Sequence, residues 1–191
     1  MRPDPSAVRP DPSATRPGAN PAVFVDATLF MGMHSKDDTV RLAAKAFFAG
    51  RLAAGDAGGV VMSWEQVGRC DDLVWGYERG VQDEYYPFMD VLHTDLAIER
   101  AAYTEDDIRR ACTTPGFDGL PTHERLLLAQ VAGRGGVLHT ASPRLTARAG
   151  LPVVPIVPDG SAGPLGETTF PSYLEDLYQR SLVLTVVSEN L

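Results

Sequence analysis

Five oxygen-bearing side chains are candidates for shared chemistry. They are Asp26, Thr28, Glu65, Glu124 and Ser142, and no lysine stands beside them to balance the three carboxylates. Buried carboxylates without such a partner favour a bound cation, because uncompensated charge is costly away from water. Oxygen ligands alone suit Mg²⁺ or Mn²⁺ rather than Zn²⁺. The residue types therefore indicate a magnesium or manganese site.

Two of the acids follow short apolar runs that are typical of buried strands. Residues 23–25 are β-branched or aromatic and lead directly into Asp26. Residues 60–62 form a second such run, and Ser63 after it is placed to cap a helix whose first turn holds Glu65. We expect both acids at the carboxyl ends of strands.

The other two positions lie on either side of a later strand. Glu124 is in the polar first turn of a helix expected over 122–132, and Ser142 follows a strand expected over 137–140. Strands alternating with helices predict a three-layer α/β/α sandwich with a central, mainly parallel sheet. Ligands bind such sheets beyond the carboxyl ends of the strands, so the five side chains should converge there.

The remaining pattern divides the chain into a tail, a domain and an extension. Residues 1–20 contain a Pro-rich seven-residue repeat, which predicts a disordered tail. Residues 21–158 form the expected domain, and residues 159–191 a loop and helix that pack on the domain or on a second copy, as a homodimer. Further helices are expected at 40–52, 64–77, 83–96 (kinked or started at Pro87), from 105 after a capping box at Thr104, and 171–182, and further strands at 98–103 and, at a sheet edge, 151–157.

Simpler explanations compete with the site at several positions. Asp26 can cap a turn, with Thr28 bonded to nearby backbone. Glu65, with Arg69 and Asp72 on the same helix face, can belong to a salt-bridge ladder instead of a polar site wall. The acids at 105–107 resemble a metal cluster but are better explained by the preference of first helical turns for negative charge.

Composition limits the function classes. The 191-residue chain has a net charge of −8, which argues against broad, unaided nucleic-acid binding. Only two of its 17 basic residues, Lys36 and Lys45, are lysine, a bias typical of a GC-rich, bacterial genome, so arginine abundance is poor evidence for phosphate binding.

The chain shows no signal of export or membrane insertion. Its apolar runs are shorter than the roughly 20 residues that span a bilayer, and we expect a cytoplasmic protein without membrane contact. Cys70 and Cys112 lack metal or disulfide spacing and are expected to be reduced core residues.

The order of four motifs resembles the PIN domain of metal-dependent ribonucleases. The motifs are Val-Phe-Val-Asp-Ala-Thr (23–28), Val-Val-Met-Ser-Trp-Glu (60–65), Gly-Leu-Pro-Thr-His-Glu-Arg-Leu-Leu-Leu-Ala-Gln (119–130) and Gly-Val-Leu-His-Thr-Ala-Ser-Pro-Arg-Leu (136–145). The resemblance covers roughly residues 22–157. It implies a PIN-like fold, a phosphodiester hydrolase, RNA as substrate and a small antitoxin-like protein as partner.

The resemblance also assigns roles to the five side chains. Asp26, Glu65 and Glu124 match the acidic positions and would hold one or two Mg²⁺ or Mn²⁺ ions. Glu124 replaces the usual Asp, and Ser142 stands where the family often has a further Asp. Thr28 and Ser142 would orient water or ligand. The missing acid removes a charge that would help to hold a second metal.

Two other function classes remain open. The scaffold can be adapted to a small metabolite, which predicts a closed pocket lined by aromatic residues such as Trp64, Trp75, Tyr85 and Tyr86, or to protein binding, which predicts that the three acids do not meet at one cation. A ribonuclease predicts a basic rim around an acidic pocket. The four histidines are expected at the surface or in packing, and this set comprises His34, His93, His123 and His139.

Overall fold

The computed structural model describes residues 21–55, 59–156 and 169–187 and contains a five-stranded parallel sheet. The strand order is β3-β2-β1-β4-β5. The strands are β1 (Val23–Val25), β2 (Val61–Ser63), β3 (Glu99–Ala101), β4 (Val137–Thr140) and β5 (Val153–Pro155). β1 is therefore central, and β5 lies at an edge, as its prolines predict.

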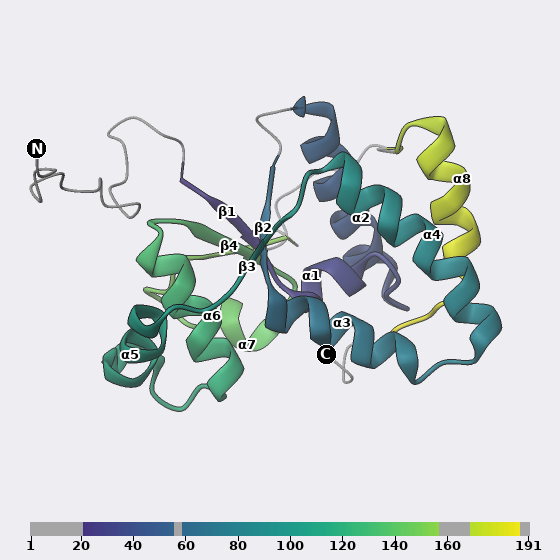
Figure 1. Ribbon diagram of the computed structural model, residues 1–191. Helices are drawn as coiled ribbons and strands as arrows, with labels where there is room; N and C mark the ends of the chain where they lie inside the picture. Colours follow the sequence, from purple (N-terminus) through teal and green to yellow (C-terminus); the bar gives the residue numbers. More distant parts are fainter. Residues whose placement is uncertain (1–20, 56–58, 157–168, 188–191) are drawn as a thin grey trace, which may run out of the picture.

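Helices cover both faces of the sheet, which confirms the expected three-layer α/β/α sandwich (Figure 1). α1, α2, α4 and α8 lie on one side of the sheet, and α5, α6 and α7 on the other. The bounds are α1 (Ala27–Gly32), α2 (Asp38–Ala53), α3 (Trp64–Trp75), α4 (Arg79–Asp95), α5 (Glu105–Thr113), α6 (Thr122–Gly133), α7 (Pro143–Thr146) and α8 (Ser172–Ser181).

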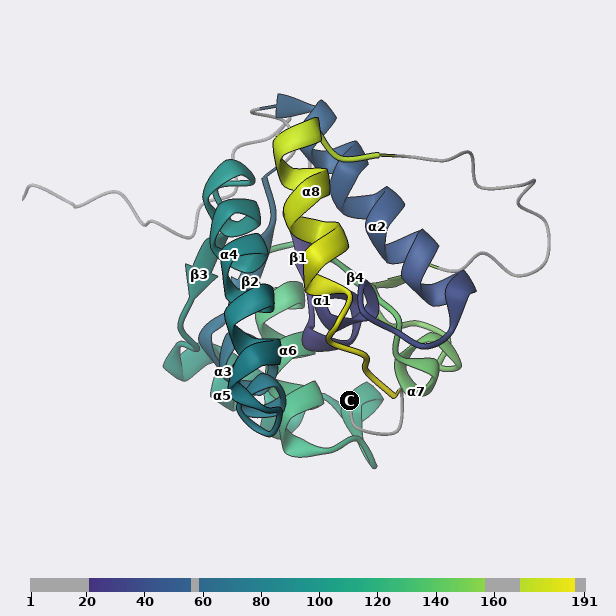
Figure 2. The same ribbon diagram turned by 90° about the vertical axis from the view of Figure 1, so that its right-hand side faces the viewer.

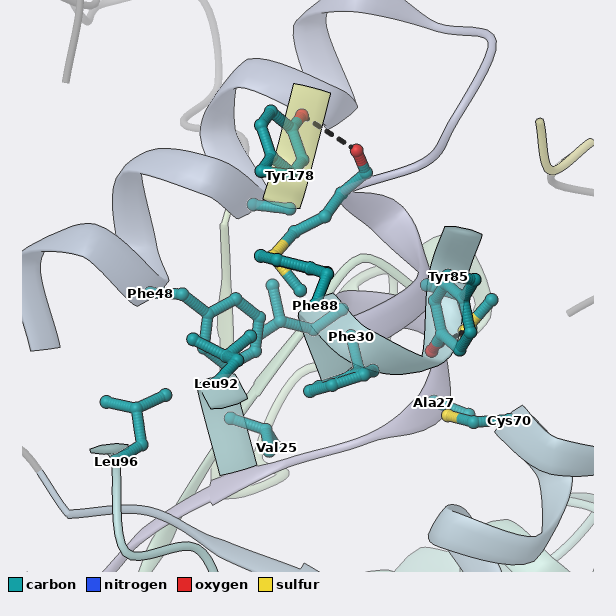
Figure 3. Close-up of a cluster of buried hydrophobic side chains, with 14 of the residues drawn as sticks. Val25, Ala27, Phe30, Phe48, Cys70, Tyr85, Phe88, Leu92, Leu96 and Tyr178 are labelled. Carbon is teal, nitrogen blue, oxygen red and sulfur yellow. Dashed lines mark hydrogen bonds between the residues drawn. The ribbon is translucent and has the colours of Figure 1, made fainter. Parts of the chain in front are cut away.

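Each face of the sheet has its own hydrophobic core. Successive residues of a strand point to opposite faces, so Val25 joins the larger core and Phe24 the smaller one. The larger core gathers aromatic side chains from α1, α2 and α4, with Tyr178 of α8 at its edge (Figure 3). Burial on both faces explains why the strands read as short continuous apolar runs.

Strand register brings the predicted site positions to one sheet edge. Val25 pairs with His139, so Asp26 and Thr140 follow next to each other on β1 and β4. A close backbone approach at the opposite ends of these strands requires Gly136. A Cβ there would lie 2.7 Å from the Ala22 carbonyl oxygen, so a larger residue would push the strands apart.

Several local expectations need correction. Residues 27–32 form α1 directly after β1, because Asp26 caps that helix and its apolar side chains fill the core. α4 begins eight residues before Pro87 instead of at it. Pro87 lies on the exposed face of α4, where water can bond the carbonyl that it leaves without a donor. α7 was not expected, because it is only four residues long.

Other local expectations are confirmed. Ser63 caps α3 through its side chain, and Thr104 and Asp107 form the reciprocal capping box of α5. Cys70 is buried, but Cys112 is exposed, so only the first is a core residue. No helix among the described residues is long and apolar enough to cross a membrane. The expected tail at 1–20 and the loop at 159–168 lie outside the described residues.

The carboxyl-terminal segment packs on its own domain. α8 lies against α4, and the chain after it returns to the turn that follows α1 (Figure 2). There the Val186 N–H donates to the His34 carbonyl at 2.8 Å, and the Lys36 N–H donates to the Val186 carbonyl at 3.0 Å. The Tyr178 hydroxyl adds a 2.9 Å bond to the Met33 carbonyl. Of the two expected destinations for this segment, the structure shows packing on the domain.

His34 is buried and neutral at the centre of this contact. The Ser181 hydroxyl donates to the Tyr178 carbonyl at 2.7 Å, so its oxygen accepts from His34 Nε2 at 2.8 Å. His34 Nδ1 is then unprotonated, and it has no partner among the described residues. Burial lowers the pKa of His34 to about 3. The carboxyl-terminal segment is thus attached through a histidine that resists protonation.

We predict that His34 makes the fold sensitive to acid. The unfolded chain takes up a proton near pH 6.5 and the folded protein does not, so stability falls as pH falls below 6.5. At pH 5 the loss due to this residue is about 2 kcal/mol. Urea denaturation at pH 7.5 and at pH 5 measures this effect. Between the two pH values, the free energy of unfolding should decrease by about 2 kcal/mol less in His34→Gln than in the wild type.

His123→Gln is the control for this experiment, because the His123 side chain is partly exposed. It should alter the pH dependence less than His34→Gln does. An unchanged pH dependence in His34→Gln would show that the buried imidazole is not neutral.

Candidate functional site

Asp26 links the central strand to both neighbouring connections at the site. Its Oδ1 accepts from the Leu29 N–H at 2.9 Å and from the Thr28 hydroxyl at 2.8 Å. Its Oδ2 accepts from the Thr140 hydroxyl at 2.5 Å. Burial raises the pKa of the Asp26 carboxyl, and these hydrogen bonds partly offset the rise. A carboxylate has about four acceptor positions, so three bonds leave about one, on Oδ2.

Glu124 is the second buried acid of the site. It lies in the first turn of α6 and is only 6% exposed. Its Oε1 is 3.6 Å from Arg144 Nε, and its buried Oε2 has no hydrogen-bond partner among the described residues. Burial raises the pKa of Glu124, and the Asp26 charge raises it further, against the opposing effect of Arg144. Such an unsatisfied oxygen is costly unless something binds it.

Asp26 and Glu124 line one small pocket. The space within it is about 10 Å³, enough for one water-sized group. Its lining consists of Asp26, Thr28, Gln66, Arg69, His123, Glu124, Leu127, Ser142 and Leu145. Four of the five predicted site residues therefore meet at the expected edge of the sheet.

Glu65, the fifth, is placed differently. Its Oε2 accepts from Gln66 Nε2 at 2.7 Å and from the Tyr103 hydroxyl at 3.2 Å, and the pocket is lined by Gln66 instead. Gln66 Oε1 in turn accepts from the Ala27 N–H at 2.8 Å, beside Asp26. Neighbouring helical residues point about 100° apart, so only one of the two can face the pocket. Glu65 orients Gln66.

The hydroxyl positions are held by the same network. Thr28 Oγ1 accepts from the Ala141 N–H at 3.1 Å, and Thr140 Oγ1 accepts from the Ser142 N–H at 2.9 Å. Ser142 is buried at the pocket wall. The hydroxyl groups thus fix the connection between β4 and α7 against β1, and they place Ser142 opposite the acids.

Basic groups also surround the pocket. Arg69 and His123 belong to its lining, and Arg144 lies beside Glu124. Burial lowers the pKa of His123, and Arg69 and Arg144 lower it further. His123 is therefore mostly neutral at pH 7, and the two arginines supply positive charge beside the acids.

The donor set fits one divalent cation of the magnesium type. Mg²⁺ keeps several waters and is typically held by one or two carboxylates, and Asp26 and Glu124 each have an acceptor position left at the pocket. The expected set of three carboxylates is not assembled. Within the described ranges no group of three or more His, Cys, Asp and Glu side chains is placed to hold a metal.

Two other expectations are resolved by the structure. In α5, Arg109 pairs with Glu105 and Asp106, while Asp107 serves the capping box, so these acids act within their own helix. Of the aromatic residues considered for a closed pocket, Trp64 and Trp75 are exposed, and Tyr85 lies in the core, where it lines a cavity of about 10 Å³.

Sequence reasoning missed several residues of the pocket. They are Gln66, Arg69 and His123, and Arg144 beside Glu124 was missed as well. Arg69 had a signal, because it lies four residues after Glu65 on a face considered as a site wall. His123 was expected at the surface or in packing. It lies at the pocket because the first turn of α6 is positioned beside the carboxyl ends of the central strands.

Fold and site together define a parallel α/β sandwich with an acidic pocket beyond the carboxyl ends of its central strands. The chain belongs to the family of unknown function DUF6190, whose match covers residues 17–191. Comparisons of this chain with curated proteins and with solved structures found no match.

We predict that Glu124→Gln stabilises the protein at neutral pH. Burial and the Asp26 charge raise the pKa of Glu124 above its unfolded value, so the ionised side chain destabilises the fold above that pKa. Removing the charge should add about 1 kcal/mol at pH 7.5, or roughly 2–4 °C in Tm. The gain should vanish near pH 4, where Glu124 is protonated in both states.

Thermal unfolding at the two pH values tests this, with Glu105→Gln as the control. Glu105 is exposed and should yield no gain. A Glu124→Gln protein less stable than wild type at pH 7.5 would contradict the electrostatic account of the site.

Proposed function

We propose that the protein is a phosphodiester hydrolase that uses one Mg²⁺ or Mn²⁺ ion held by Asp26 and Glu124. The observation that carries the proposal is the meeting of two buried carboxylates at one water-sized pocket, where Glu124 Oε2 has no hydrogen-bond partner in the described part of the chain. Arg69 and Arg144 beside them provide charge for a phosphate. Acids alone would repel such a substrate.

Each side chain has a defined task in this proposal. Asp26 is held rigidly by its three hydrogen bonds and presents the remaining position on Oδ2. Ser142, at the pocket wall, orients water or ligand. The bound cation would lower the pKa of water and offset the charge on the phosphate. Arg144, with its side chain 57% exposed, can reach a phosphate from solvent.

His123 is suited to proton transfer. Its lowered pKa keeps the imidazole neutral at pH 7, so it can accept a proton from water or donate its N–H to a leaving oxygen. Glu65 acts at one remove by orienting Gln66, which supports the backbone next to Asp26.

The resemblance to PIN domains supports the same proposal. Asp26 ends the first strand, Glu124 lies in the helix before β4, and Ser142 follows that strand, in the order that the family would require. With Ser142 in place of an acid and Glu65 outside the pocket, the site has charge for a single cation.

We predict that Mn²⁺ binding depends much more strongly on Asp26 and Glu124 than on Glu65. In calorimetric titrations Asp26→Asn and Glu124→Gln should lose about 100-fold or more in affinity, and Glu65→Gln, the matched control, about tenfold or less. Loss of Mg²⁺-dependent cleavage of single-stranded RNA or of bis(p-nitrophenyl) phosphate should follow the same order.

Circular dichroism shows whether each variant is folded. A wild-type protein that binds no Mn²⁺ at millimolar concentration would overturn the hydrolase. It would favour the alternative of a PIN-like scaffold that binds a protein or metabolite without this chemistry. Equal losses in all three variants would instead place Glu65 among the ligands.

A further inference from the structure

A second, larger hollow opens from the acidic pocket. It encloses about 240 Å³ and shares Thr28, Glu124 and Ser142 with the pocket. We call it the groove, and its lining is Thr28, Gly32, Ser35, Asp37, Val40, Glu124, Ala141, Ser142, Pro143 and Arg144. A substrate whose phosphate lies at the pocket can place the rest of its structure here.

Two separate parts of the chain form the walls of the groove. One wall comes from the end of α1 and the start of α2, and the other from residues 141–144, where β4 leads into α7. Figure 2 shows the amino-terminal end of α2 near α7. The walls combine apolar surface from Val40, Ala141 and Pro143 with polar groups at both ends.

The groove lining holds one arginine, Arg144, and the carboxylates of Glu124 and Asp37. Arg144 stands at the pocket end, and its 3.6 Å separation from Glu124 leaves guanidinium N–H groups for an anion. Asp37 stands at the far end and caps α2 by accepting from the Thr39 and Val40 N–H groups. Both cap bonds end on Oδ1, so among the described residues Oδ2 can accept from a ligand.

We propose that the groove binds a phosphoester of about one nucleotide in size, with its phosphate at Arg144 and hydroxyl or amine donors at Asp37. This inference rests on the proposed function. A volume of 240 Å³ is below the roughly 300–1,000 Å³ of pockets for drug-sized ligands, so it suits one nucleoside rather than a longer strand. A carboxylate is also a common partner of ribose hydroxyls.

The charge at the far end disfavours a long polyanion. A strand that continued past Asp37 would meet its carboxylate, whereas the neighbouring Asp38 is paired with Arg41 at 2.7 Å. The net charge of −8 adds repulsion at long range. The groove thus favours a short phosphoester that ends before Asp37.

Binding should be measured first, because it does not require turnover. Uridine 5′-monophosphate, inorganic phosphate and a 15-nucleotide single-stranded RNA are titrated into the full chain by calorimetry, with and without Mn²⁺. We expect one molecule of the monophosphate per chain, with at least about tenfold higher affinity than inorganic phosphate. The RNA should bind no more tightly than the monophosphate.

Three variants locate the binding site. Ala141→Phe fills the groove and should weaken monophosphate binding about tenfold or more. Asp37→Asn keeps the helix cap, because Asn caps as well as Asp, and should weaken it about fivefold. Asp38→Asn is the matched control: it removes the same charge one residue away, outside the groove lining, and should leave binding unchanged.

The outcomes separate the two proposals. If monophosphate binding depends on Ala141 and Asp37 but the protein cleaves no phosphodiester, the groove proposal is supported and the hydrolase proposal is overturned. If the protein cleaves RNA and neither variant changes this activity, the hydrolase proposal is supported and the groove proposal is overturned. Absent monophosphate binding, equal effects of Asp37→Asn and Asp38→Asn, or tighter binding of the 15-nucleotide RNA would each overturn the inference.

Discussion

The site depends on a buried carboxylate at the end of the central strand. Asp26 is 3% exposed, and burying its charge is tolerable only because two hydroxyl groups and one backbone N–H bond to it. The same bonds join three parts of the chain: the end of β1, the first turn of α1 with Thr28 and Leu29, and Thr140 at the end of β4. A single polar group therefore caps a helix, aligns two strand ends and faces the pocket. Its structural and chemical roles use different acceptor positions of one side chain.

Glu124 differs from Asp26 in its hydrogen bonding. The Asp26 carboxylate accepts three hydrogen bonds, whereas the Glu124 carboxylate has few partners. Its buried Oε2 has no partner among the described residues, and Asp26 and burial both raise its pKa. Arg144 compensates only in part, since its Nε lies 3.6 Å from Oε1 and its side chain is largely in water. Proteins commonly carry such instability at functional positions. The asymmetry between the two acids is the physical reason to regard this edge of the sheet as a binding site.

Much of the fold could be predicted from the sequence, because the signals were local. Apolar runs marked the strands, and capping residues such as Ser63 and Thr104 marked helix starts. The short helices α1 and α7 were missed because four to six residues carry too little periodicity. The sequence allowed the position of the candidate site in the fold to be predicted, but not all of the residues that line it. Strand ends placed Asp26 and Ser142 correctly, but whether Glu65 or Gln66 faces the pocket depends on the rotation of α3 about its axis. That rotation is set by packing with α1 and β2, which no local pattern records.

The arrangement of the two acids gives a physical reason for a serine at position 142. An acid at 142 would stand with Asp26 and Glu124 at a pocket with room for about one water-sized group, and three negative charges there would raise one another's pKa. Ser142 avoids that cost because its hydroxyl adds no charge, and its backbone N–H still bonds to Thr140. The serine also leaves the groove wall uncharged between Glu124 and the apolar Ala141 and Pro143. A serine instead of an acid therefore lowers the negative charge of the pocket and leaves its edge open to an organic group, two effects that agree with the small phosphoester that we propose as ligand.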